Sequence, residues 1–111
     1  MEVTPEIYKK YLIEKALRRS YVKRRIVLYL ANQGFGYVSE IARSICVTPT
    51  NVCGALRGMN GRYVAKDSLI SLGVVNEMKV KQDENIRVFS LTDAVGQDAV
   101  KICKKFEREV M

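Results

Sequence analysis

The chain has 111 residues, a length typical of one domain that can bury a core without metal or disulfide staples. Hydrophobic residues make up 48% of it, which excludes a mostly disordered protein. No apolar run is long enough to span a membrane and no secretory signal is visible, so we expect a cytoplasmic protein without a membrane partner.

Positive charge is in excess and unevenly distributed. The formal net charge is +7, and residues 41–66 contain four lysines and arginines with no acidic residue. The charges of residues 93–111 sum to zero. This distribution favours nucleic acid as a partner over the alternative of a basic but merely soluble protein.

Catalytic and metal-binding patterns are absent from the sequence. Histidine does not occur, and Cys46, Cys53 and Cys103 show no CxxC spacing, so we expect no metal and no cofactor. There is no Gly-rich phosphate loop and no GxSxG motif, so we expect no enzymatic activity. The cysteines are interpreted as small buried hydrophobes, with a redox-sensing thiol as the alternative.

Two helices are expected before residue 35. Thr4-Pro5 is a helix start, and apolar residues then recur at helical spacing to about Arg19. Ser20 either caps or kinks a second helix, which ends near Gly34. We expect a single domain over 1–111, in which residues 1–19 form an N-terminal helix outside a core at 20–92.

Residues 38–59 have the pattern of a helix–turn–helix. Ser39 is expected to cap its first helix, and Cys46-Val47 forms a tight apolar turn. Thr48-Pro49 starts the second helix, expected over about residues 49–59. In this motif the second helix enters the DNA major groove with its N-terminus first.

Four residues of the second helix are expected to face away from the core: Asn51, Cys53, Gly54 and Arg57. A glycine in a helix costs about 1 kcal/mol relative to alanine. Gly54 therefore predicts that the helix lies close to DNA or to another backbone.

A basic hairpin and a last helix follow. Residues 74–81 alternate as a strand, 82–85 form the turn, and 86–91 return. Thr92 is expected to cap a helix within residues 93–111, whose apolar positions from Val95 to Phe106 share one face. The hairpin would act as a wing, at about residues 79–87, on the DNA backbone or in the minor groove.

The candidate DNA contacts are short polar or basic side chains: Ser39, Thr48, Thr50, Asn51, Arg57, Arg62, Lys66, Lys79, Lys81 and Arg87. Hydroxyl, amide and guanidinium groups can donate to phosphates or reach base edges. Helix capping explains Thr48 without DNA, and the others can be solvated surface, so both interpretations stand. Acidic residues in the hairpin cancel part of its positive charge, so we expect this wing to bind DNA more weakly than many other wings do.

Several segments in order and spacing resemble the winged-helix domains of MarR-like and ArsR-like transcription regulators: Ile41-Ala42-Arg43, residues 47–52, Ala55-Leu56, residues 72–75 and residues 87–92. The resemblance implies a mainly α fold with a small β-hairpin, a winged helix–turn–helix with additional N-terminal and C-terminal helices. Residues 58–68 are an insertion relative to that pattern, similar to a variant in small archaeal predicted DNA-binding regulators.

The resemblance also implies a homodimer that pairs through its flanking helices. The candidate dimer contacts are Tyr8, Tyr11, Leu12, Val95, Ile102 and Phe106. The alternative is that these stripes pack within one subunit. We therefore expect a sequence-specific double-stranded DNA-binding transcription regulator, with no effector identified. The competing hypothesis is a winged-helix protein–protein module of a transcription or RNA-associated complex.

Overall fold

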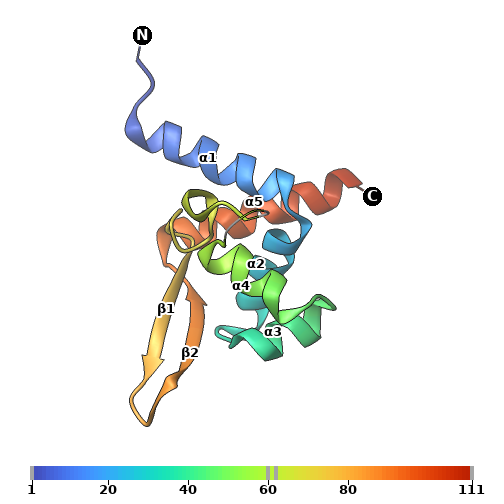
Figure 1. Cartoon of the computed structure of the whole chain (residues 1–111). Helices are drawn as coiled ribbons and strands as arrows, with labels where there is room; N and C mark the ends of the chain where they lie inside the picture. Colours follow the sequence, from blue (N-terminus) through green and yellow to red (C-terminus); the bar gives the residue numbers. More distant parts are fainter. Residues whose placement is uncertain (1, 60, 62, 111) are drawn as a thin grey trace.

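The computed structural model describes residues 2–59, 61 and 63–110. This part of the chain is mainly helical with one antiparallel hairpin, as predicted (Figure 1). Its elements are α1 (Pro5–Arg19), α2 (Tyr21–Gln33), α3 (Val38–Ile45), α4 (Pro49–Arg57), a 3-10 turn η1 (Ala65–Asp67), β1 (Val75–Val80), β2 (Asp83–Leu91) and α5 (Ala94–Val110). None of the described helices is both long and apolar enough to cross a lipid bilayer.

The corner between α1 and α2 is built by local hydrogen bonds. The Ser20 hydroxyl accepts from the backbone N–H of Lys23 at 3.1 Å, so Ser20 caps α2. The guanidinium of Arg24 donates to the carbonyl of Leu17 at 2.6 Å, which satisfies the C-terminal end of α1. Of the two roles predicted for Ser20, the cap is the one found.

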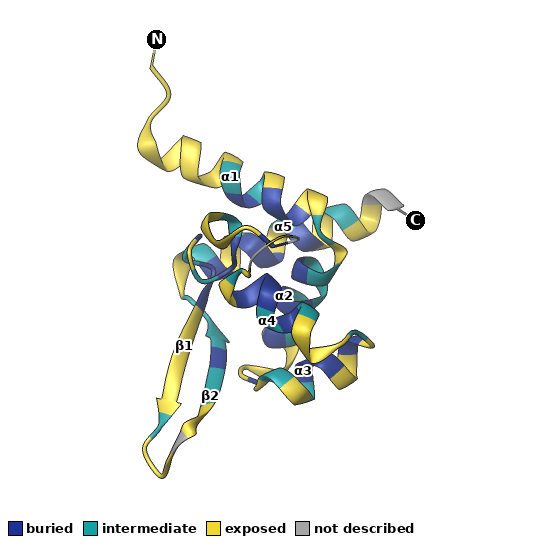
Figure 2. Cartoon of the chain, viewed as in Figure 1, coloured by how far each residue is buried: buried dark blue, intermediate teal, exposed yellow. Residues whose placement is uncertain are grey.

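The core lies where α2 meets the other helices and the base of the hairpin (Figure 2). Leu17, Ile26, Leu56 and Phe89 are completely buried and come from four different elements. Burying each such side chain contributes about 1.5–3 kcal/mol, so the core joins the flanking helices to the helix–turn–helix. The hairpin extends away from this core and is mostly exposed beyond its base (Figures 1 and 2).

The helix–turn–helix differs from prediction at both ends. The N-cap of α3 is Tyr37, without a side-chain cap, and the expected cap Ser39 is the second helical residue. The reason is a backbone pairing of Gly36 with Phe89, which ends the preceding loop earlier than expected. Helix α4 ends at Arg57, not at 59, because Gly58 adopts a φ of 85°.

The hairpin turn also lies earlier than predicted. Residues 81–82 form the turn and β2 begins at Asp83, where residues 82–85 were expected to turn. A register irregularity between Lys79 and Val80 pairs Val80 with Asp83, and alternation alone does not encode such a bulge. At the other end, the Thr92 hydroxyl accepts from the N–H of Gly96 at 2.8 Å, as expected for the start of α5.

Candidate nucleic-acid interface

An open hollow of about 450 Å³ lies between the start of α3, the end of α4 and the hairpin. Its lining residues are Tyr37, Val38, Ser39, Arg57, Asn85, Ile86 and Arg87. Three of them, Ser39, Arg57 and Arg87, were predicted DNA contacts that lie far apart in the sequence. Sequence reasoning missed Tyr37, Asn85 and Ile86, which carry no motif of their own.

Arg57 is held at the edge of this hollow by two contacts. Its guanidinium lies 5.5 Å from the centre of the Phe89 ring, a cation–π distance. It also forms an ion pair with Glu77 of β1. The side chain is therefore oriented by the hairpin while 44% of it remains exposed.

Glu77 lies between two arginines. Its carboxylate pairs with Arg57 and is 4.0 Å from Nε of Arg87. The strand register explains this arrangement, because Glu77 faces Phe89 and Lys79 faces Arg87 across the hairpin, on the same side. Glu77 thus lies close to both guanidinium groups and also reduces the positive charge of this surface.

The start of α4 presents polar side chains. Thr48 is the N-cap, and its hydroxyl accepts from the backbone N–H of Asn51 at 3.3 Å and from the Asn51 side-chain amide at 2.9 Å. Thr50 is exposed beside it. The carbonyl oxygen of Asn51 accepts from the hydroxyl of Tyr63 at 3.0 Å, so both ends of that side chain have partners within the protein.

Gly54 corrects the expectation that it faces outward. It is buried, and a Cβ built on it would lie 2.3 Å from Cδ2 of Tyr63. The close approach is made by the aromatic ring of the 58–68 segment, and not by DNA or a backbone. Tyr63 packs on α4 in this way, and the N–H groups of Leu69 and Ile70 further along the chain donate to the α4 carbonyls of Ala55 and Leu56.

The remaining predicted contacts are dispersed. Lys79 is on β1 and Lys81 is in the turn at the hairpin tip, and both are exposed. Lys66 is on η1, which packs against α1 at the end of the hairpin opposite its tip (Figure 1). Lys66 is therefore not part of the hollow at Arg57. Arg62 lies outside the described residues.

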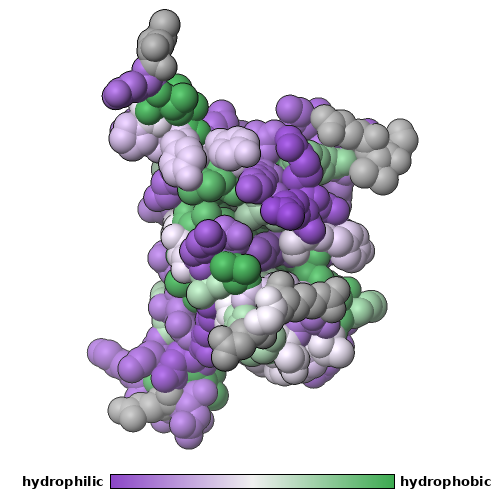
Figure 3. All heavy atoms as spheres, turned by 45° about the horizontal axis from the view of Figure 1, so that its top comes forward, coloured by the Kyte–Doolittle hydropathy of each residue, from purple (hydrophilic) through white to green (hydrophobic). Residues whose placement is uncertain are grey.

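The predicted dimer residues fall into two groups. Leu12, Val95, Ile102 and Phe106 are half-buried against the core of their own chain. Tyr8 and Tyr11 are exposed, and their rings stack with centroids 6.5 Å apart. Figure 3 shows hydrophobic residues at the surface near this end of the molecule. Val3, just before α1, and Ile7 within it are exposed as well.

The described residues contain no group of three or more cysteine, aspartate or glutamate side chains arranged to hold a metal ion. Cys46 is exposed, Cys53 is half-buried and Cys103 is buried. Burial raises the pKa of the Cys103 thiol to about 12, so this thiol stays protonated in the folded protein.

A family model described as EarA-like matches residues 13–102. The chain belongs to the EarA-like family. It is 36% identical over 96 residues to "Uncharacterized protein MJ0905" of Methanocaldococcus jannaschii, which covers 84% of this chain and 82% of that protein. The predicted similarity to small archaeal proteins is thereby confirmed.

The fold of this EarA-like chain is that of MarR-type winged-helix proteins. S. aureus MepR, solved bound to an oligodeoxyribonucleotide, superposes with a TM-score of 0.64 at 18% identity, covering 93% of this chain and 70% of MepR. YusO from Bacillus subtilis superposes with a TM-score of 0.60 at 16% identity, and the match covers 94% of this chain and 71% of YusO. The adhesin competence repressor AdcR from Streptococcus pyogenes superposes with a TM-score of 0.60 at 15% identity. The match covers 82% of this chain and only 60% of the length of AdcR.

Proposed function

We propose that this EarA-like chain is a sequence-specific regulator of transcription that binds double-stranded DNA. Helix α4 would enter the major groove, and the hairpin would lie on the adjacent backbone or in the minor groove. The observation that carries the proposal is the hollow that brings Ser39, Arg57 and Arg87 together from α3, α4 and β2. The likeness to MarR-type regulators supports a DNA-binding function of this kind.

Within this proposal the side chains of α4 have different roles. Thr50 and Arg57 are exposed and would meet bases or phosphates. Asn51 is held by Thr48 and Tyr63, so it would contact DNA in one fixed orientation. Lys79 and Lys81, exposed near the hairpin tip, would contact phosphates.

The first experiment measures binding to duplexes selected from a random pool, by fluorescence anisotropy over a salt series. The logarithm of the affinity should fall linearly with that of the salt concentration, with a slope of about −0.9 for each phosphate contact. Selected duplexes should bind more tightly than random duplex at the same salt. No binding of random duplex at low salt and micromolar protein would favour the protein–protein module instead.

Arg57→Ala tests the placement of α4. We expect it to weaken binding to the selected duplex by about 1–3 kcal/mol, the range for an arginine that contacts a base. Lys105→Ala, which removes the same charge from an exposed position on α5, is the control and should leave affinity within about twofold. Equal effects of the two variants would show that α4 does not carry the interface.

We also propose that two copies pair through the N-terminal part of α1, as in the regulators that the chain resembles. The exposed Val3, Ile7, Tyr8 and Tyr11 supply an apolar surface that the chain itself leaves uncovered. Light scattering after gel filtration should give a dimer mass for the full chain and a monomer mass for Ile7→Glu/Tyr11→Glu. A monomer mass for the unaltered chain at 100 micromolar would refute the pairing.

A further inference from the structure

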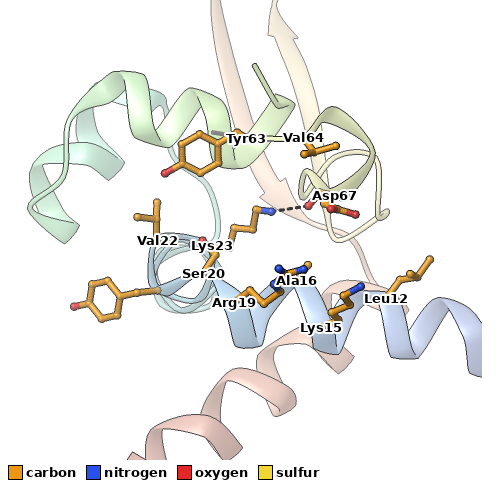
Figure 4. Close-up of a pocket in the computed structure, with 11 residues that line it drawn as sticks. Leu12, Lys15, Ala16, Arg19, Ser20, Val22, Lys23, Tyr63, Val64 and Asp67 are labelled. Carbon is orange, nitrogen blue, oxygen red and sulfur yellow. Dashed lines mark hydrogen bonds between the residues drawn. The ribbon is translucent and has the colours of Figure 1, made fainter. Parts of the chain in front are cut away.

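A second hollow, of about 540 Å³, lies where the end of α1, the start of α2 and residues 63–67 meet (Figure 4). It shares no residue with the hollow at Arg57. Its volume is within the range of sites for small molecules, about 300–1,000 Å³. Neither the proposed DNA contacts nor the core explains why this space is lined by charged side chains.

The lining is cationic. It contains three basic residues, Lys15, Arg19 and Lys23, and one acidic residue, Asp67, which give a formal charge of plus two. Each cation comes from a different turn of α1 or α2, and the last residue of η1 supplies the acid. A phosphomonoester, with about −1.5 to −2 charges at pH 7, matches this charge better than a singly charged carboxylate does.

Lys23 is the least expected of these residues, because only 7% of it is exposed. Its ammonium donates to the backbone carbonyl of Asp67 at 2.8 Å, as Figure 4 shows, and among the described residues it forms no ion pair within 4.0 Å. Burial lowers the pKa of Lys23, since the charged form loses hydration that a carbonyl replaces only in part. An anion in the hollow would add to the one negative charge that already acts on this ammonium, that of the Asp67 carboxylate.

The rest of the wall is apolar. Leu12 and Ala16 of α1, Val22 of α2 and Val64 line the same hollow. Such a wall accommodates the organic part of a ligand, while the cations bind its acidic group. The lining therefore fits a small phosphorylated organic molecule better than inorganic phosphate.

Tyr63 connects this hollow to the recognition helix α4. The side chain lines the hollow, its ring lies against Gly54, and its hydroxyl donates to Asn51 at 3.0 Å. Only 8% of Tyr63 is exposed, so it cannot change position without changing its contacts with α4. A ligand in the hollow would thus touch the residue that holds Asn51 in place.

We propose that the hollow between α1, α2 and residues 63–67 binds a small phosphomonoester, and that Tyr63 transmits its presence to α4. Ligand binding in this proposal does not depend on DNA binding, whereas the effect of the ligand on DNA affinity rests on the proposed function. Because binding and regulation are linked by a coupling free energy, the ligand should change duplex affinity by about fivefold or more.

Calorimetric titration of the full chain with phenyl phosphate tests the binding half. We expect one saturable site per chain, weaker binding of inorganic phosphate, and none of benzyl alcohol, which lacks the charge. The variant Lys15→Gln/Arg19→Gln should bind phenyl phosphate at least tenfold more weakly. The control Lys101→Gln/Lys105→Gln, which removes two charges from α5, should bind as the parent does.

Absence of saturable phenyl phosphate binding, or equal binding by the two double variants, would overturn the proposal. It would also be overturned if Lys15→Gln/Arg19→Gln, without phenyl phosphate, weakened duplex binding more than the control pair does. That result would mean that the hollow receives a DNA phosphate.

Tyr63→Phe tests the connection to α4. This variant keeps the ring and removes the hydroxyl that reaches Asn51. At phenyl phosphate concentrations that saturate this variant, the ligand should no longer change duplex affinity. In the parent chain, saturation with phenyl phosphate should shift the NMR signals of the Asn51 side-chain amide, and this readout needs no DNA. If those signals do not move on saturation, Tyr63 does not transmit the ligand.

Discussion

Gly54→Ala is expected to destabilise the protein even though alanine is the better helix former. The helix itself would gain about 1 kcal/mol from the exchange. The new Cβ would lie 2.3 Å from Cδ2 and 2.7 Å from Cγ of Tyr63, and Cγ is near the root of that side chain. The ring therefore has to leave its buried position, at an overpacking cost near the upper end of about 1–3 kcal/mol. The net loss is about 2 kcal/mol.

The sign of this effect should depend on Tyr63. In a Tyr63→Ala background the ring is absent, so Gly54→Ala should stabilise the helix by up to about 1 kcal/mol. In a Tyr63→Phe background the ring remains, and Gly54→Ala should still be destabilising. The free energies come from urea unfolding followed by circular dichroism at 25 °C, combined as a double-mutant cycle. The same change in the Tyr63→Ala and parent backgrounds would show that the ring does not pack on Gly54.

Two further predictions concern charge and pH. Glu77→Gln removes the negative charge that pairs with Arg57 and lies 4.0 Å from Arg87, so duplex affinity at low salt should rise about three- to tenfold by anisotropy. Glu14→Gln, which removes the partner of Arg18 on α1, should leave it unchanged. Burial raises the pKa of the Cys103 thiol to about 12 in the folded state, whereas in the unfolded chain the thiol ionises near its ordinary pKa of 9.0. The thiol's share of the unfolding free energy should thus fall by about 1.4 kcal/mol per pH unit above pH 9. Lys23, whose pKa is lowered, has the opposite effect: below pH 10.5 its share of the unfolding free energy rises with pH. Between pH 8.5 and 10.5, the free energy of urea unfolding should fall less steeply with pH for Cys103→Val than for the parent. Equal slopes would contradict the raised pKa of the Cys103 thiol.

The local elements could be predicted from the sequence because their signals are local. Thr48-Pro49 marks the start of α4, and Ser20 and Thr92 accept hydrogen bonds from N–H groups three and four residues on. These caps act over one helical turn, and the apolar spacing of the helices follows from a 3.6-residue period. The order of the elements then indicated the MarR-type winged helix, which the structural similarity to MepR confirms.

Only the tertiary structure determined the contacts between residues far apart in the chain. The sequence pointed to Gly54 as a place of close approach, but only the folded chain shows that the neighbour is the ring of Tyr63. The pairing of Gly36 with Phe89 moved the start of α3 away from Ser39. The partner of Arg57 is Glu77, twenty residues away on another element. Periodicity states which face of an element is buried, whereas the identity of the facing residue depends on how the elements pack, and that is settled only by the whole core.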